Sequence, residues 1–146
     1  MDKNNDYTEM LRRHQQEIND FPMAFAFSDR QLKEALKKLG ATIDEVTTLP
    51  GNCAIFRKSD VSAWYELCER HSDELKEAMK DKKFAETAFR YEMDNHEYAI
   101  NWEGDSDVLA CFGYSGMDEL KADGLSSAYC KAREEHIEYM MKLGVI

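Results

Sequence analysis

The sequence predicts an α+β fold: one mostly helical domain over residues 1–146, with about five helices and a small antiparallel β-sheet in the first third. Two observations favour this fold. Apolar residues recur at helical spacing in four long segments, and the β-prone segments are short and confined to residues 23–57. A chain of this length buries roughly 70% of its unfolded surface, so it folds without disulfides or metal.

Two helices are predicted at the start of the chain. Tyr7–Phe21 repeats large side chains in steps of four and three, and Pro22 ends it because the residue before a proline avoids helical conformation. Ser28–Leu39 follows, with Ser28 as the capping residue at its start. Gly40 supplies the left-handed residue that closes this helix.

Three short segments are β-prone, namely Met23–Phe27, Val46–Leu49 and Cys53–Arg57. Pro50-Gly51-Asn52, between the last two segments, is typical of a turn. These segments predict the small antiparallel sheet. The alternative for residues 41–58 is a plain connecting loop.

The remaining helices are predicted over 60–80, 84–101 and 126–143, with two short helical pieces at 108–112 and 117–123. The segment Phe84–Asn101 is the expected centre of the fold. Ala85, Met93 and Ile100 lie within about 60° of Phe89 on a helical wheel, whereas aromatic residues occupy the opposite face. A helix that is apolar on two faces contacts other structure on both.

Charge narrows the classes of function. The formal net charge is −10, with 19 Lys and Arg against 29 Asp and Glu. Binding to a phosphate backbone needs clustered basic residues, so we expect no direct contact with nucleic acid. An acidic chain suits a protein partner with a basic surface, although acidity also serves solubility alone.

The four cysteines are widely spaced and form no C-x-x-C pair, which excludes zinc-ribbon and thioredoxin-like motifs. The sequence has no signal peptide and no long apolar run, so we expect no membrane span and a reduced, cytoplasmic protein. In that environment the cysteines are expected to be buried apolar residues.

The positions of the four histidines are the strongest indication of site chemistry in the sequence. All four lie on the apolar stripes of separate predicted helices, and Glu92 precedes His96 by one turn. Neutral imidazoles ligate metals, and a helical core can gather them. The weak metal candidates are therefore His71, His96, Glu92 and His136. Their spacing matches neither the Glu-x-x-His motif of di-iron bundles nor His-Glu-x-x-His, and the alternative is four separate histidines, each satisfied by its own neighbours.

Other catalytic patterns are missing from the sequence. There is no Gly-x-Ser-x-Gly elbow, no phosphate-binding loop and no EF-hand spacing. The segment 108–120 resembles a helix-turn-helix, but its second helix carries acidic residues where a DNA reader needs basic ones. We therefore predict no catalytic residues and no cofactor.

Aromatic residues form a candidate partner-binding surface. It comprises the back of the central segment and the residues that follow it: Phe84, Tyr91, Tyr98 and Trp102. Tyrosine and tryptophan are enriched at the centres of interfaces. The alternative is that the sheet or the C-terminal helix covers these rings.

At Phe21–Ser28 and Asn95–Tyr98 the sequence resembles a domain-of-unknown-function family of small acidic proteins from gut bacteria, their phages and other mobile elements. The resemblance implies no catalytic residues. It does imply a context in which small acidic proteins often inhibit host nucleases. We therefore predict a non-catalytic interaction module, in its most concrete form a counter-defence, anti-CRISPR-like inhibitor that binds a basic surface of a host nuclease. The alternative is a metal- or small-ligand-binding helical domain, with the possibility of enzyme activity, built on the core-facing histidines.

Overall fold

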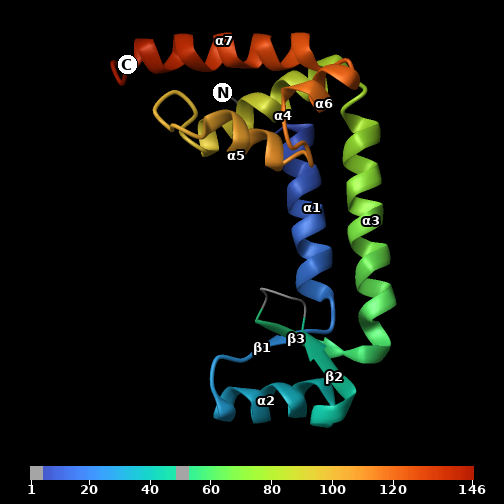
Figure 1. Cartoon of the computed structure of the whole chain (residues 1–146). Helices are drawn as coiled ribbons and strands as arrows, with labels where there is room; N and C mark the ends of the chain where they lie inside the picture. The colour runs from blue at the N-terminus through green and yellow to red at the C-terminus, as the bar shows by residue number, and fades with distance from the viewer. Residues whose placement is uncertain (1–4, 49–52) are drawn as a thin grey trace. The chain divides into compact units, whose positions relative to one another are not determined.

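A computed structural model describes residues 5–48 and 53–146 (Figure 1). These residues form seven α-helices and three β-strands, so the expected count of about five helices is wrong. The two additional helices are the short pieces after the central segment, each less than two full turns long. Contacts group the chain into two compact units, residues 13–72 and residues 73–146 together with the chain up to residue 12. Whether the two units unfold as one domain stays a prediction.

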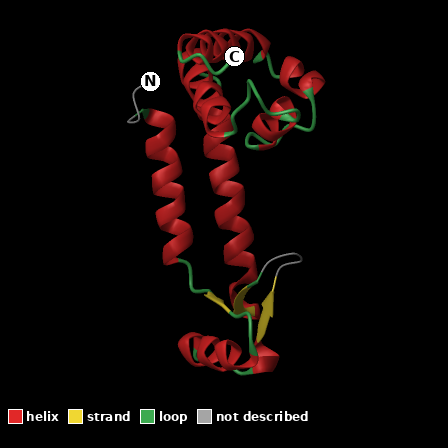
Figure 2. Cartoon of the chain, turned by 90° about the vertical axis from the view of Figure 1, so that its left-hand side faces the viewer, coloured by secondary structure: helices red, strands yellow, loops and turns green. Residues whose placement is uncertain are grey.

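The unit formed by residues 13–72 holds the sheet (Figure 2). Strands β1 (Ala24–Phe25), β3 (Ala54–Arg57) and β2 (Val46–Thr48) are antiparallel in the order β1-β3-β2, with Ala24 opposite Ile55 and Val46 opposite Arg57. The sheet confirms the expectation of an antiparallel sheet in the first third. The predicted turn at 50–52 lies outside the described residues.

Helix α2 (Asp29–Leu39) packs on this sheet, where Ala35 and Leu39 meet Ala24, Val46 and Ile55 in a small core. Its ends follow the sequence signals. Ser28 accepts a hydrogen bond from the Gln31 backbone N–H, and Gly40 has a φ of 62°, which only glycine adopts readily. On the other side of the sheet, Phe56 packs against Phe21 and Trp64.

Two long helices contribute residues to both units. They are α1 (Asp6–Asp20) and α3 (Val61–Ala78). A single 3₁₀ turn at Ile43–Glu45 precedes β2, and a second at Lys58–Asp60 precedes α3. Both helices end close to the residues that the sequence pattern predicted.

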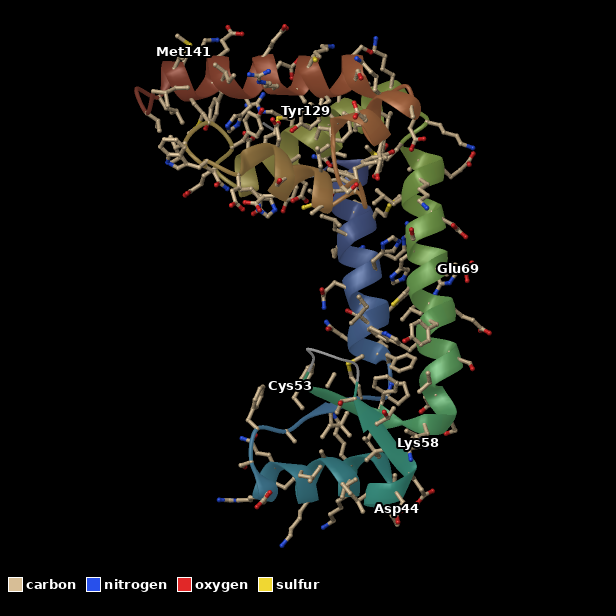
Figure 3. The ribbon with its side chains drawn as sticks, in the orientation of Figure 1. Asp44, Cys53, Lys58, Glu69, Tyr129 and Met141 are labelled. Carbon is tan, nitrogen blue, oxygen red and sulfur yellow. The ribbon has the colours of Figure 1, made fainter. Side chains whose placement is uncertain are left out.

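The larger core is built by α4 (Lys82–Asn95) and α7 (Ser126–Lys142), which run alongside each other in Figure 1. Small residues at Ala85, Ala88 and Ala132 are fully buried, so the two backbones approach closely. Phe89 packs edge-on to Tyr129, with 5.1 Å between ring centres. Figure 3 marks Tyr129 at this buried end of α7 and Met141 at the exposed end.

Helices α5 (Gly104–Ala110) and α6 (Met117–Ala122) complete this core through Val108, Leu109 and Leu120. The central helix ends at Asn95, six residues earlier than predicted. Glu97 has a φ of 52°, and the Tyr98 backbone N–H reaches back to the Met93 carbonyl oxygen. This is a left-handed helix ending made without glycine, which a sequence pattern of apolar residues does not reveal.

Candidate metal centre

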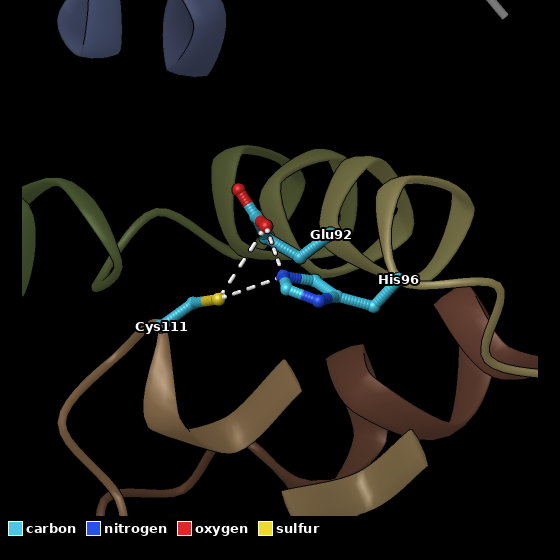
Figure 4. A group of neighbouring side chains, drawn as sticks. All are labelled: Glu92, His96 and Cys111. Carbon is cyan, nitrogen blue, oxygen red and sulfur yellow. Dashed lines mark hydrogen bonds and ion pairs between the residues drawn. The ribbon is translucent and has the colours of Figure 1, made fainter. Parts of the chain in front are cut away.

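Three side chains with metal-binding chemistry meet where the end of α4 faces the end of α5 (Figure 4). Glu92 lies in the last turn of α4, and His96, four residues later, is the C-cap residue of that helix, so the two side chains project from the same face. Cys111 is the C-cap residue of α5. Because α5 packs on α4, the thiol points at the carboxylate and the imidazole.

The donor atoms form a nearly equilateral triangle. Glu92 Oε2 lies 3.3 Å from His96 Nε2, His96 Nε2 lies 3.3 Å from Cys111 Sγ, and Cys111 Sγ lies 3.4 Å from Glu92 Oε2. The Asp107 backbone carbonyl oxygen lies 3.3 Å from the same sulfur. One carboxylate, one imidazole nitrogen and one sulfur therefore converge on a single point.

A second layer of contacts holds the triangle in place. The Tyr7 hydroxyl donates a 2.8 Å hydrogen bond to Glu92 Oε1, which leaves Oε2 directed at His96 and Cys111. Glu92 is only 5% exposed, whereas the His96 side chain is 33% exposed. The triangle is thus anchored on its inner side and open to solvent on its outer side.

The electrostatics of the site disfavour a thiolate. Burial and the nearby Glu92 carboxylate raise the pKa of Cys111 to about 12. Burial and the same carboxylate also raise the pKa of Tyr7 above its usual range. A divalent cation would reverse this preference, because a coordinated thiol loses its proton.

This geometry does not suit a cysteine nucleophile. In a nucleophile–histidine–acid arrangement, the acid orients one ring nitrogen while the other faces the nucleophile. Here Glu92 and Cys111 both approach Nε2 of His96, and the raised pKa of the Cys111 thiol opposes activation. Convergence on one point is the arrangement that a shared cation requires.

The distances between the donor atoms are close to those around a tetrahedral zinc ion. Zinc binds imidazole nitrogen and carboxylate oxygen at about 2.0–2.2 Å and thiolate sulfur at about 2.3 Å. Two ligand atoms of such a tetrahedron lie roughly 3.3–3.6 Å apart. The nitrogen–oxygen edge of 3.3 Å lies in that range, and the two sulfur edges of 3.3 and 3.4 Å are slightly shorter than the roughly 3.5–3.6 Å that the longer zinc–sulfur bond requires.

The predicted metal candidates are only partly brought together. Glu92 and His96 belong to the triangle, but His136 does not. Its Nδ1 lies 2.6 Å from Asp94 Oδ1, and its Nε2 accepts a 3.2 Å hydrogen bond from the Ala99 backbone N–H. Both ring nitrogens of this fully buried histidine are therefore satisfied by protein groups.

His71 lies in the other unit, where its ring stacks on His14 with 3.8 Å between ring centres. Its Nε2 is 3.5 Å from Glu17 Oε2 and makes no hydrogen bond among the described residues. Glu17 also accepts a hydrogen bond from the Arg70 guanidinium. The His71 ring is thus placed by stacking and one carboxylate.

Sequence reasoning missed Cys111 because it treated the cysteines as buried apolar residues. The structure corrects that expectation: Cys53, Cys68 and Cys130 are exposed and Cys111 is half-buried. Cys111 lies 15 residues after His96, across a loop and a short helix. Short-range spacing therefore carried no signal that the two residues meet.

The predicted partner-binding aromatics divide into two groups. Phe84 and Tyr91 are half-buried and pack edge-on to Tyr7, and the Tyr98 hydroxyl donates to Asp105 at 2.7 Å. Trp102, by contrast, is fully exposed. Whether any of the four contacts a partner stays a prediction.

The chain belongs to DUF7659, a family of unknown function, whose family model matches residues 6–135. Comparisons with curated proteins and with solved structures find no match. In the part of the chain that the structure describes, no helix is long and apolar enough to span a membrane.

Proposed function

We propose that this protein is a metal-binding helical domain that holds a zinc-class divalent cation on Glu92, His96 and Cys111. The observation that supports it is the triangle of donor atoms, with edges of 3.3, 3.3 and 3.4 Å. Mixed oxygen, nitrogen and sulfur donors suit zinc better than magnesium or calcium, which take oxygen ligands. This proposal takes up the alternative from the sequence and replaces His71 and His136 with Cys111.

Three protein ligands leave one position of a tetrahedral zinc site for water or another ligand. The one-third exposure of the His96 side chain supports a solvent-facing location for that position. Tyr7 is then a positioning residue, because its hydrogen bond fixes which oxygen of Glu92 faces the cation. A zinc-bound water is chemically competent for hydrolysis or proton transfer.

The direct test is metal analysis of protein purified without a histidine tag, followed by cobalt substitution. We expect one zinc per chain, and a cobalt-loaded sample with the ligand-field bands of a tetrahedral site and a thiolate-to-cobalt charge-transfer band. Cys111→Ser should lose the charge-transfer band and bind metal at least a hundredfold more weakly, because an oxygen replaces the thiolate.

Cys130→Ser is the matched control, because Cys130 is an exposed thiol elsewhere in the same unit. This variant should keep both the metal content and the charge-transfer band. The proposal fails if the wild-type chain binds no divalent metal. It also fails if Cys111→Ser and Cys130→Ser bind metal equally.

A second function, that of an acidic interaction module, is favoured by one specific observation. Trp102 projects fully into solvent from a chain of net charge −10, next to the half-exposed Ile100. Exposed tryptophan is a frequent energetic anchor of interfaces. We propose a protein partner with a basic surface, of which a host nuclease bound by a counter-defence inhibitor is the most concrete form.

A pull-down from the native host with the full chain tests this second function. Binding to an identified partner should weaken as salt rises, because screening shortens the reach of the charges. Trp102→Ala should weaken binding by roughly tenfold or more, whereas Tyr65→Ala, an exposed aromatic in the other unit, serves as the control. Equal affinity at low and high salt would refute the proposed attraction between this acidic chain and a basic surface of the partner.

A further inference from the structure

A cavity of about 420 Å³ lies within the unit formed by residues 73–146 and the chain start, and its lining does not include the three metal-binding side chains. The end of α3, the residues that follow α5 and the start of α7 form its walls. Its volume falls within the roughly 300–1,000 Å³ of typical small-molecule sites. Neither the family match nor the metal centre assigns a role to it.

The inner wall of the cavity is apolar. Met79, Phe112 and Leu125 are buried residues of the larger core, and Leu75 packs against that core. Side chains of this kind cover a hydrocarbon chain or ring but offer it no hydrogen bond. The inner part of any ligand is therefore expected to be apolar.

The rim of the cavity carries positive charge. Lys76, Lys80 and Lys82 line it together with one acid, Asp123. Asp123 accepts a 2.6 Å hydrogen bond from the Tyr114 hydroxyl, and Lys80 pairs with Glu77 at 2.7 Å. Within the described residues, ion pairs join Lys80, Lys131 and Lys142 to carboxylates but not Lys76 or Lys82.

The start of α7 adds to this positive field. Leu125 occupies the N-cap position and no side chain caps the helix, so its first backbone N–H groups lack the usual side-chain acceptor. Ser127 and Ala128, from the first turn of this 17-residue helix, line the same cavity. The positive end of the helix dipole and two unpaired lysines thus border one apolar hollow.

We propose that this cavity binds a small amphipathic carboxylate, with its hydrocarbon tail against Met79 and Phe112 and its head at Lys76, Lys82 and the start of α7. Charge complementarity selects the anion, and the apolar wall selects the tail. This proposal does not rest on the metal centre, because none of the three proposed metal ligands lines the cavity.

Decanoate, kept below its micelle concentration, is the probe, and isothermal titration with the full chain is the measurement. We expect saturable binding of one decanoate per chain. Decanol and decyltrimethylammonium, which share the tail but lack the negative head, should bind at least about tenfold more weakly. Chemical-shift changes in an NMR titration should centre on Phe112, Leu125 and Ser127.

Variants separate the proposed site from adsorption elsewhere. Lys76→Gln and Lys82→Gln should each weaken decanoate binding by about fivefold, whereas Lys83→Gln, a neighbouring exposed lysine outside the cavity lining, should not. Ser127→Trp should block the cavity from an exposed position without disturbing the core. The proposal is overturned if decanoate does not bind or decanol binds equally well. Unchanged affinity in the Lys76→Gln, Lys82→Gln and Ser127→Trp variants would overturn it as well.

Discussion

Two histidines of the same unit, both beside a carboxylate, have opposite surroundings. His136 is fully buried, and each of its ring nitrogens has its own partner, Asp94 on one side and the Ala99 backbone N–H on the other. His96 is one-third exposed and directs a single nitrogen at both Glu92 and Cys111. An imidazole whose two ring nitrogens both have hydrogen-bond partners stabilises the fold. Donor atoms that converge on one point instead leave room for a cation.

The loop after α4 supplies both arrangements. His96 contributes its side chain to the triangle, and three residues later Ala99 contributes its backbone N–H to His136. Glu97, between them, holds the left-handed φ of 52° that redirects the chain. Changes in this loop should therefore separate metal binding from stability.

The largest expected effect is stabilisation by metal. If His96 is a ligand, zinc present at roughly a thousandfold over its Kd should raise the free energy of unfolding by about 4 kcal/mol. His96→Ala should abolish this gain, while costing little stability without zinc. Urea unfolding with zinc and with chelator measures both quantities, and a zinc effect that persists in His96→Ala would contradict the difference between the two histidines.

The second-largest expected effect is the loss of stability when the buried His136 is removed. His136→Ala should lower the free energy of unfolding by about 3 kcal/mol, because it leaves Asp94 and the Ala99 N–H without their partner and opens a cavity. Metal affinity should stay within a fewfold of wild type if the variant folds. Chemical unfolding provides the first value, and a loss below about 1 kcal/mol would show that His136 is not a structural anchor.

Gly104 tests the packing beside His136. A Cβ at this position would lie 2.9 Å from both the Tyr98 ring and the Tyr98 backbone carbonyl oxygen, and the Tyr98 ring meets His136 edge-on. Gly104→Ala should therefore cost about 2 kcal/mol, since a backbone atom has to move. Thermal unfolding is the measurement. Gly116→Ala is the comparison: its Cβ meets nothing within 4 Å, so it should cost only the smaller penalty of alanine at the N-cap of α6.

A smaller effect of opposite sign is expected at Glu97. Because a non-glycine residue at a left-handed φ is strained, Glu97→Gly should stabilise the protein by up to about 1 kcal/mol. The gain should appear in chemical unfolding without metal. A clear loss of stability would show that the Glu97 side chain contributes more than its backbone strain costs.

The smallest effect is a pH dependence in the unit formed by residues 13–72. Burial, and then the stacked His14, lower the pKa of His71, whereas Glu17 acts in the opposite direction. The unfolded chain therefore takes up a proton more readily than the folded chain. Stability should be full above pH 6.5, the ordinary value of the group, and should fall as the pH drops below it.

Melting curves between about pH 7.5 and 5 measure this dependence. His71→Gln should flatten the His71 contribution to the curve, because glutamine does not titrate. A wild-type melting temperature that stays constant over this window would contradict the lowered pKa of His71.

Much of the candidate site was within reach of the sequence, and one residue was not. Helical spacing placed Glu92 and His96 on one face, since residues four apart on a helix lie one turn apart on the same side. It also placed His136 on a buried face, but face and phase alone do not say which partners fill an imidazole. Cys111 stayed hidden because its meeting with His96 depends on how α5 folds back on α4.

The sequence by itself determined the positions of the long helices, both caps of α2 and the small sheet, because spacing, Ser28, Gly40 and Pro22 act over a few residues. It also determined the negative charge of the chain. Only the tertiary structure decided where the central helix ends, which histidines have hydrogen-bond partners on both ring nitrogens, and which thiol lies beside the Glu92 carboxylate. Those outcomes depend on contacts between residues far apart in the chain, and no local pattern encodes such contacts.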